Sequence, residues 1–286
     1  MSRVLVTGGT GFVGSNLVKR LKHDGHEILV IDNYSSGKHE NEIEGVTYID
    51  DETKNINIIQ LPFTPEVVFH LGEYSRVHPS FDEYERVWQY NSHGTFQVLH
   101  FCNKYKIKIV YAGSSTRFAH EGVLHSPYSF TKATNIEFIK GFCKWYDLKY
   151  SICYFYNVFG PGYDSSPVKG FESVVSVFEK QYKSNQPLTI SGDGSQCRMF
   201  TYVDDIVDGL IKSWQYELND EFELGNPKLY TILEIAKLFS DNIVFIESRK
   251  GDRDNSVIHN FDKTSDLLSW YPTMNIEEWI NKIKHK

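Results

Sequence analysis

The sequence has few cysteines, no long apolar run and no excess of positive charge. Its four cysteines are widely spaced, without the spacing of a metal site or a redox pair: Cys102, Cys143, Cys153 and Cys197. No apolar stretch approaches the length of a membrane span, and a β-rich run, not a signal sequence, follows the first residues. The net charge of −7 argues against nucleic acid or a membrane surface as the main partner. These features predict a cytoplasmic protein with reduced thiols and no bound metal.

A glycine-rich turn at residues 7–14 stands between an apolar run, Val4–Val6, and a helical pattern at residues 16–21. Three glycines of this turn have the spacing G-x-G-x-x-G in a strand–turn–helix context: Gly9, Gly11 and Gly14. Glycine permits the tight turn and a close approach to a pyrophosphate, and the helix N-terminus presents N–H donors to that anion. A second apolar run ends in Asp32, where a carboxylate would hold a ribose 2′-hydroxyl and repel a 2′-phosphate. The sequence therefore predicts an NAD site.

Short β-rich runs alternate with helical patterns over the first half of the chain. The expected strands lie at residues 28–31, 67–71, 107–112 and 150–156, and the expected helices at residues 94–105 and 128–146. This alternation predicts an α/β fold with a doubly wound parallel sheet and ligands at the carboxyl ends of its strands. Residues 1–160 are expected to form this domain and residues 161–286 mainly a smaller lobe. Segments near 200–225 and 255–265 are expected to return to the first domain.

Tyr128 and Lys132 are four residues apart at the start of the expected helix 128–146. This spacing is about one helical turn, so both side chains lie on one face. A nearby ammonium favours the phenolate form of a tyrosine, which can then act as a base. The spacing alone is common, and an ordinary surface pair is the alternative. Its position after the glycine turn, and after a strand that ends at residues 113–116, favours a catalytic role.

The order of these motifs resembles the extended short-chain dehydrogenase/reductase family, and within it the nucleotide-sugar epimerases and dehydratases of the UDP-glucose 4-epimerase type. The resemblance extends to about residue 252 and rests on Thr7–Gly14, Asp32–Asn33, His70–Leu71, Asn91, Gly94–Thr95, Ser114, Tyr128, Lys132, Asn157–Pro161, Gly192–Gly194, Arg198, Phe200–Asp205 and Arg249–Asp252. It implies a Rossmann-type sheet with a smaller mixed α/β lobe that binds the substrate. It also implies a homodimer formed through the helices near residues 94–105 and 128–146.

The resemblance implies a role for each matching residue. Tyr128 would be the base, Lys132 would assist it and bind the nicotinamide ribose, and Ser114, or Thr116, would hydrogen-bond the reacting oxygen. Other contacts to NAD would come from Gly8, Gly11, Phe12, Val13, Gly14, Asp32, Asn33, Leu71, Gly72 and Asn91, with Asp50 or Asp51 accepting from the adenine amine. The nucleotide-diphosphate sugar would be bound by Glu73, Arg76, Ser114, Asn157, Arg198, Arg249 and Asp252, because guanidinium groups form paired bonds to phosphate.

Several positions depart from the family pattern. The loop Gly72–Arg76 replaces one that is usually rich in alanine, and Glu73 and Arg76 would either contact an unusual sugar or pair with each other at the loop surface. Arg117 replaces a small or apolar residue, and Tyr154 stands where arginine is often found. We expect the loops around Glu73, Arg117 and Tyr154 to determine which sugar is bound.

The residues after Ser114 separate the possible reactions. Sugar 4,6-dehydratases of this family carry an Asp–Glu pair there, whereas this chain has Ser115 and Thr116, whose hydroxyls cannot do carboxylate acid/base work near neutral pH. The leading hypothesis is NAD-dependent epimerisation at C4 of a nucleotide-activated hexose through a transient 4-keto sugar. The alternative enzyme is a nucleotide-sugar 4-dehydrogenase or 4-keto reductase. A dinucleotide sensor or partner-binding protein is the non-enzymatic alternative, which the presence of both Tyr128 and Lys132 disfavours.

Overall fold

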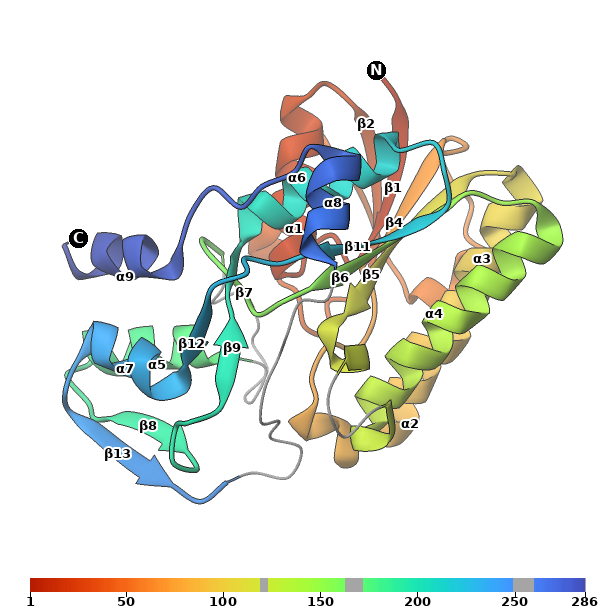
Figure 1. The fold of residues 1–286 in the computed structure, drawn as a ribbon. Helices are drawn as coiled ribbons and strands as arrows, with labels where there is room; N and C mark the ends of the chain where they lie inside the picture. The colour runs from red at the N-terminus through yellow and green to blue at the C-terminus, as the bar shows by residue number, and fades with distance from the viewer. Residues whose placement is uncertain (119–122, 163–171, 249–259, 286) are drawn as a thin grey trace.

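A seven-stranded parallel sheet forms the centre of the protein (Figure 1). The computed structural model describes residues 1–118, 123–162, 172–248 and 260–285. The strand order is β11-β6-β5-β4-β1-β2-β3. After β1 the chain adds β2 and β3 on one side, then crosses over and adds β4 and the later strands on the other side, which confirms the predicted doubly wound sheet. The strands are β1 (Arg3–Thr7), β2 (Glu27–Asp32), β3 (Thr47–Asp50), β4 (Val67–His70), β5 (Lys108–Ser114), β6 (Tyr150–Phe155) and β11 (Asp220–Leu224).

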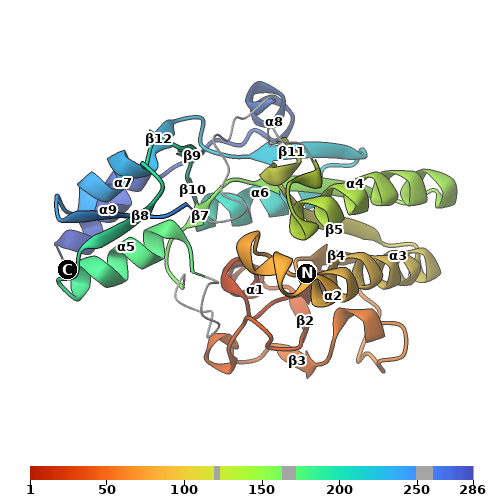
Figure 2. The same ribbon diagram turned by 90° about the horizontal axis from the view of Figure 1, so that it is seen from below.

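Helices cover both faces of the sheet. Successive side chains along each strand point to opposite faces, and on each face the apolar side chains pack with those of helices into a separate core. In β1, Val4 and Val6 pack into one core and Leu5 into the other. The first core includes residues of α1 (Phe12–His23), α6 (Val203–Gln215) and α8 (Phe261–Leu268). The second includes residues of α3 (Gly94–Tyr105) and α4 (Pro127–Tyr146), which lie side by side on the opposite face (Figures 1 and 2).

A smaller lobe with its own core follows β6. Its helices are α5 (Val174–Lys183), α7 (Ile232–Phe239) and α9 (Ile276–Lys284), and its strand pairs are β8 (Leu188–Ser191) with β13 (Ile243–Ile246) and β9 (Cys197–Met199) with β12 (Leu229–Thr231). A short pair, β7 (Val158–Phe159) with β10 (Thr201–Tyr202), joins the segments that pass between the lobes. Phe178, Ile190 and Phe239 belong to the buried core of this lobe. In the part of the chain that the structure describes, no helix could span a membrane.

The elements that carry the candidate site lie where the sequence pattern placed them, with small differences at their ends. The expected helix 94–105 coincides with α3. Helix α4 begins one residue before Tyr128, because Ser126 caps its N-terminus by accepting from the Ser129 backbone N–H and Pro127 suits the first turn. Strand β5 continues to Ser114, where it still pairs with β6. A short helix, α2 (Tyr84–Val87), precedes a π-helical turn over Trp88–His93 that leads into α3.

Candidate active site

A cavity of about 560 Å³ opens at the carboxyl ends of β1, β4 and β5 and is closed on its other side by the smaller lobe. This is the position at which open α/β sheets bind ligands. Most of the predicted site residues line it: Gly8, Gly11, Phe12, Val13, Gly14, Asp32, Asn33, Leu71, Gly72, Glu73, Arg76, Ser114, Thr116, Tyr128, Lys132, Asn157 and Arg198. The structure therefore brings residues predicted to bind NAD and residues predicted to bind the nucleotide sugar into one cavity.

The glycine turn between β1 and α1 is too crowded for side chains at three of its positions, Gly8, Gly9 and Gly14. Gly8 has φ +72°, and a Cβ there would lie 2.7 Å from the Cα of Gly72. A Cβ on Gly14 would lie 2.0 Å from the carbonyl oxygen of Gly8. Helix α1 starts directly after Gly11, and no acidic residue stands in its first turn. The first turn of α1 therefore presents its backbone N–H groups to the cavity without an acidic side chain of its own, which suits a pyrophosphate.

Asp32 is held in place by the backbone around it. Its Oδ2 accepts from the N–H of Thr10 at 2.8 Å, and its Oδ1 accepts from the N–H of Tyr34 at 2.9 Å. These bonds leave the carboxylate fixed at the end of β2, on the cavity wall beside Asn33. A carboxylate with remaining acceptor capacity at this position fits a ribose diol.

All four polar side chains of the predicted catalytic set line the cavity, Thr116 from the short turn after β5. Tyr128 and Lys132 come from the first turns of α4, and both are buried at their cavity-facing positions. Ser114 ends β5, and its Oγ accepts from the Thr116 hydroxyl at 3.0 Å. Because Thr116 donates to it, the Ser114 hydroxyl is oriented to donate its own hydrogen elsewhere.

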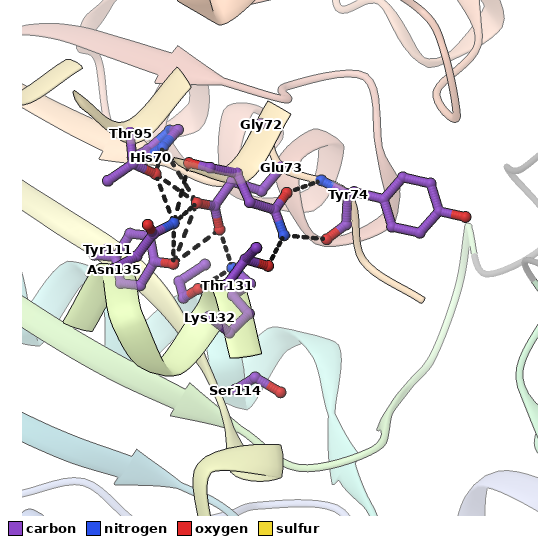
Figure 3. A network of polar contacts seen from close by, with 12 residues as sticks. His70, Gly72, Glu73, Tyr74, Thr95, Tyr111, Ser114, Thr131, Lys132 and Asn135 are labelled. Carbon is purple, nitrogen blue, oxygen red and sulfur yellow. Dashed lines mark hydrogen bonds and ion pairs between the residues drawn. The ribbon is translucent and has the colours of Figure 1, made fainter. Parts of the chain in front are cut away.

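The position of Glu73 contradicts one of its two sequence-based expectations, the pair with Arg76 at the loop surface. Its side chain is 1% exposed, and it forms an ion pair with Lys132 instead of lying at the loop surface with Arg76 (Figure 3). The Arg76 guanidinium donates to the Ser75 carbonyl oxygen at 3.0 Å. The interpretation of Glu73 as a surface partner of Arg76 is therefore wrong, because four buried donors hold its carboxylate inside the protein.

One predicted cofactor contact needs correction, and the predicted contact to the adenine amine stays a prediction. The buried amide of Asn91 is engaged by the main chain of Tyr74, at 2.7 Å to its N–H, and by the Thr131 hydroxyl at 3.0 Å, so it anchors the loop after Glu73. The Asp51 carboxylate accepts from the Glu52 N–H and the Asn55 amide, each at 2.7 Å. Neither Asp50 nor Asp51 belongs to the described cavity wall, which at this point consists of Glu52, Thr53 and Lys54.

Arg117 and Tyr154 lie outside the described cavity wall. The Arg117 guanidinium donates to Glu137 Oε1 at 2.6 Å, and the Tyr154 hydroxyl donates to Glu221 of β11. Their neighbours Ser115, Thr116 and Phe155 do line the cavity, so the expectation that the loops around Arg117 and Tyr154 help to select the sugar stays a prediction.

The smaller lobe contributes a wall that the sequence analysis missed. Its apolar part consists of Val174, Val175, Val177, Phe178, Ile190, Phe200, Ile232 and Ile246. Periodicity marked residues 188–190 as a strand, but it gave no indication that this strand faces a ligand. Two predicted substrate residues, Arg249 and Asp252, lie outside the described residues.

The pKa of His70, behind the cavity, gives a prediction about stability. Burial is the main cause that lowers this pKa from its ordinary 6.5 to about 4. The unfolded chain therefore binds a proton first as the pH falls, and the native state loses about 3 kcal/mol of stability between pH 6.5 and 4. In urea unfolding across this range, His70→Asn should lose less stability than the wild type. His100→Asn, at an exposed position, should lose as much free energy of unfolding as the wild type over this pH range. An equal loss in all three proteins would contradict the prediction.

Comparisons with known proteins give a consistent family match. Residues 4–225 match the model described as the NAD dependent epimerase/dehydratase family. UDP-glucuronic acid decarboxylase 2 of Arabidopsis thaliana is 29% identical over 96% of this chain, which spans 66% of that relative's length. A putative UDP-glucose 4-epimerase of Methanocaldococcus jannaschii is 27% identical, with 98% of this chain and 96% of the relative covered. The crystal structure of a UDP-glucose 4-epimerase from Thermotoga maritima, with UDP-glucose, superposes with a TM-score of 0.91 at 28% identity over 99% of this chain and 98% of the other.

Proposed function

Because this chain belongs to the NAD-dependent epimerase/dehydratase family, we propose that it epimerises a nucleotide-activated hexose at C4 through a transient 4-keto sugar. The observation that carries the proposal is the convergence of Tyr128, Lys132 and Ser114 on the cavity that the glycine turn also lines. Oxidation of a secondary alcohol needs a base and a hydride acceptor next to the same carbon. This cavity has room and residues for both.

Three observations of this chain indicate that the cavity fits NAD. The turn excludes side chains at Gly8 and Gly14, the N-terminus of α1 has no acidic side chain in its first turn, and Asp32 is fixed at the end of β2. Asp32 favours NAD over NADP, since its carboxylate would repel a 2′-phosphate. When bound, NAD supplies the acceptor and donor of hydride.

The protein's own groups manage the proton. Tyr128 takes the proton of the sugar 4-hydroxyl, and the Lys132 ammonium stabilises the phenolate that does so. Ser114 donates to the same oxygen, which keeps the developing carbonyl in place. Return of the proton from Tyr128 completes the reaction once the 4-keto sugar has presented its other face. No carboxylate is needed for these steps.

Substrate recognition is proposed for the side of the cavity that the smaller lobe forms. Arg198 and Asn157 line it beside the apolar wall described above, a combination that suits a diphosphate next to a flat base. A UDP-sugar is the first choice, because the Thermotoga maritima epimerase and a UDP-N-acetylglucosamine 4-epimerase of Methanobrevibacter ruminantium, each 28% identical, were solved with UDP-containing ligands.

Decarboxylation of a nucleotide-activated hexuronic acid is the second candidate, because five of the relatives are UDP-glucuronic acid decarboxylases. It begins with the same oxidation at C4. A carboxylate at C6 is then β to the new carbonyl, and loss of CO₂ follows readily from such a keto acid. Of the two reactions, a substrate without a carboxylate at C6 can therefore undergo only the epimerisation.

A panel of nucleotide sugars followed by NMR in deuterated water tests the proposal. Inversion at C4 without solvent deuterium is the expected result. Conversion of a hexuronic acid with release of CO₂ would favour the decarboxylase. Net formation or loss of NADH would identify a dehydrogenase or reductase, and deuterium at C5 without release of CO₂ would point to a dehydratase. An inert protein that still binds NAD would favour a sensor.

We also propose that the chain forms a homodimer through α3 and α4. Both helices carry large apolar side chains that remain exposed in the single chain, among them Phe96 at 43%, Phe130 at 39% and Trp145 at 69%. Two copies paired through these helices would bury such a surface. Analytical ultracentrifugation should show a dimer, and a charged residue at Phe96 should dissociate it.

A further inference from the structure

The carboxylate of Glu73 lies at the centre of a buried polar network directly behind the catalytic cavity (Figure 3). It forms an ion pair with Lys132 and accepts from the Thr95 hydroxyl at 2.5 Å, from the Tyr111 hydroxyl at 2.9 Å and from the Asn135 amide at 2.8 Å. The side chains of Glu73 and Lys132 are 1% and 6% exposed. A carboxylate buried this deeply is stable only with such partners.

This network fixes the position of the Lys132 ammonium. Besides Glu73, its Nζ donates to the carbonyl oxygen of Ala112 at 2.6 Å. Ala112 lies in β5, two residues before Ser114, and Lys132 lies one turn after Tyr128 in α4. The contact with Glu73 therefore ties the ammonium to the loop after β4, at the junction of the elements that carry the three catalytic residues.

The network also determines the net charge beside Tyr128. Burial raises the pKa of the Glu73 carboxyl, but Lys132, His70 and hydrogen bonds outweigh burial, so this pKa lies below its ordinary value and the group is charged at neutral pH. On β4, His70 is neutral there, because burial lowers its pKa to about 4. On β5, burial and then Glu73 raise the pKa of Tyr111 well above its ordinary value. Thr95 of α3 and Asn135 of α4 carry no charge, so Glu73 and Lys132 form a neutral pair.

We propose that Glu73 is a positioning residue that holds the Lys132 ammonium and, by compensating its charge, sets the pH range in which Tyr128 acts as the base. The inference rests on the function proposed above for Tyr128 and Lys132. A lone ammonium beside a phenol favours the phenolate strongly, whereas a neutral ion pair favours it less. Glu73 thus moves the working range of the base to higher pH than Lys132 alone would give.

Glu73→Gln tests this inference, because it keeps the shape of the side chain and removes its charge. The acidic limb of the pH profile of kcat/KM should move to lower pH by about one unit. At the plateau, kcat should fall about tenfold, because the ammonium loses its anchor. Glu73→Asp keeps the charge at a shorter reach, so its acidic limb should remain at the wild-type pH while kcat still falls.

The same shift should be visible without turnover. In protein labelled with ¹³C at the tyrosine ζ carbon, the signal that Tyr128→Phe removes belongs to Tyr128, and Glu73→Gln should move its titration to lower pH. An unchanged titration, or one moved to higher pH, would overturn the inference. A wild-type protein that turns over no nucleotide sugar would refute the proposed function instead, and this titration would still test Glu73.

Two further variants keep the test valid if Glu73→Gln does not fold. Glu73→Gln with Lys132→Met removes both charges, so Tyr128 should titrate near the wild-type pH. A titration moved to higher pH by more than about one unit would mean that Lys132 acts uncompensated in the wild type, which would overturn the inference. Glu221→Gln is the matched control: Glu221 also binds a lysine, Lys140 at 2.5 Å, and the Tyr154 hydroxyl. It lies outside the described cavity wall, so both pH profiles should stay as in the wild type.

Discussion

Tyr128→Phe is expected to lower turnover of the nucleotide sugar about a thousandfold or more, the upper part of the range for loss of a general base. The substitution removes one hydroxyl from the cavity wall and keeps the ring that packs at the start of α4. NAD should therefore still bind, with an unchanged affinity in a fluorescence titration. Single-turnover measurement of NADH formation would show whether the loss lies in the oxidation step.

Tyr154→Phe is the matched control for that variant. Its ring is also buried, and its hydroxyl donates to Glu221 outside the described cavity wall. The melting temperature should fall, because Glu221 loses a donor, while kcat/KM should stay at the wild-type value. Wild-type turnover in Tyr128→Phe would refute the proposed mechanism. A large loss of activity in Tyr154→Phe would restore the idea that Tyr154 takes part in substrate binding.

Gly14→Ala is the second change for which we expect a large effect. The added Cβ would lie 2.0 Å from the Gly8 carbonyl oxygen and 2.9 Å from the Cα of Gly9, so helix α1 must move away from the turn. Overpacking of this kind costs about 1–3 kcal/mol of stability. The displaced N–H groups lose their alignment on the pyrophosphate, and loss of one or two charge-assisted bonds corresponds to an NAD affinity lower by about a hundredfold.

Calorimetry of NAD binding and thermal unfolding measures both effects. Gly141→Ala is the control, because Gly141 also lies inside a helix, yet its Cβ would meet only the exposed ring of Trp145 at 3.3 Å. That variant should be as stable as the wild type or slightly more stable, since alanine favours a helix over glycine by about 0.5–1 kcal/mol. Equal NAD affinities in both variants would show that the turn does not cradle the cofactor.

The parts of the site that the sequence predicted are local in the chain. The glycine turn, Asp32 and the Tyr128–Lys132 pair each depend on residues within one strand–turn–helix unit or one helical turn, and all of them line the cavity. The strand pattern was sufficient for five of the seven strands of the sheet, all but β3 and β11, because short continuous apolar runs indicate strands that are buried on both faces.

The parts that it could not predict depend on contacts between distant segments. Glu73 meets Lys132 across 59 residues of sequence, and the Asn91 amide meets Thr131 across 40. A charged residue in a polar loop is usually exposed, so no local pattern indicated that Glu73 is buried. The same holds for the apolar wall of the smaller lobe, whose residues are typical of any core until the two lobes face each other.

Strand β11 has a consequence for how this protein can be divided. It comes from the second half of the chain, pairs with β6 along its whole length and forms one edge of the sheet. Its Glu221 and Glu223 accept from the hydroxyls of Tyr154 and Tyr156. A chain shortened to its first 160 residues would leave β6 as a bare edge strand with both acceptors missing. The nucleotide-binding half therefore cannot be separated from the second half of the chain without losing this edge strand. Its sheet is complete only once β11 (Asp220–Leu224) has been synthesised.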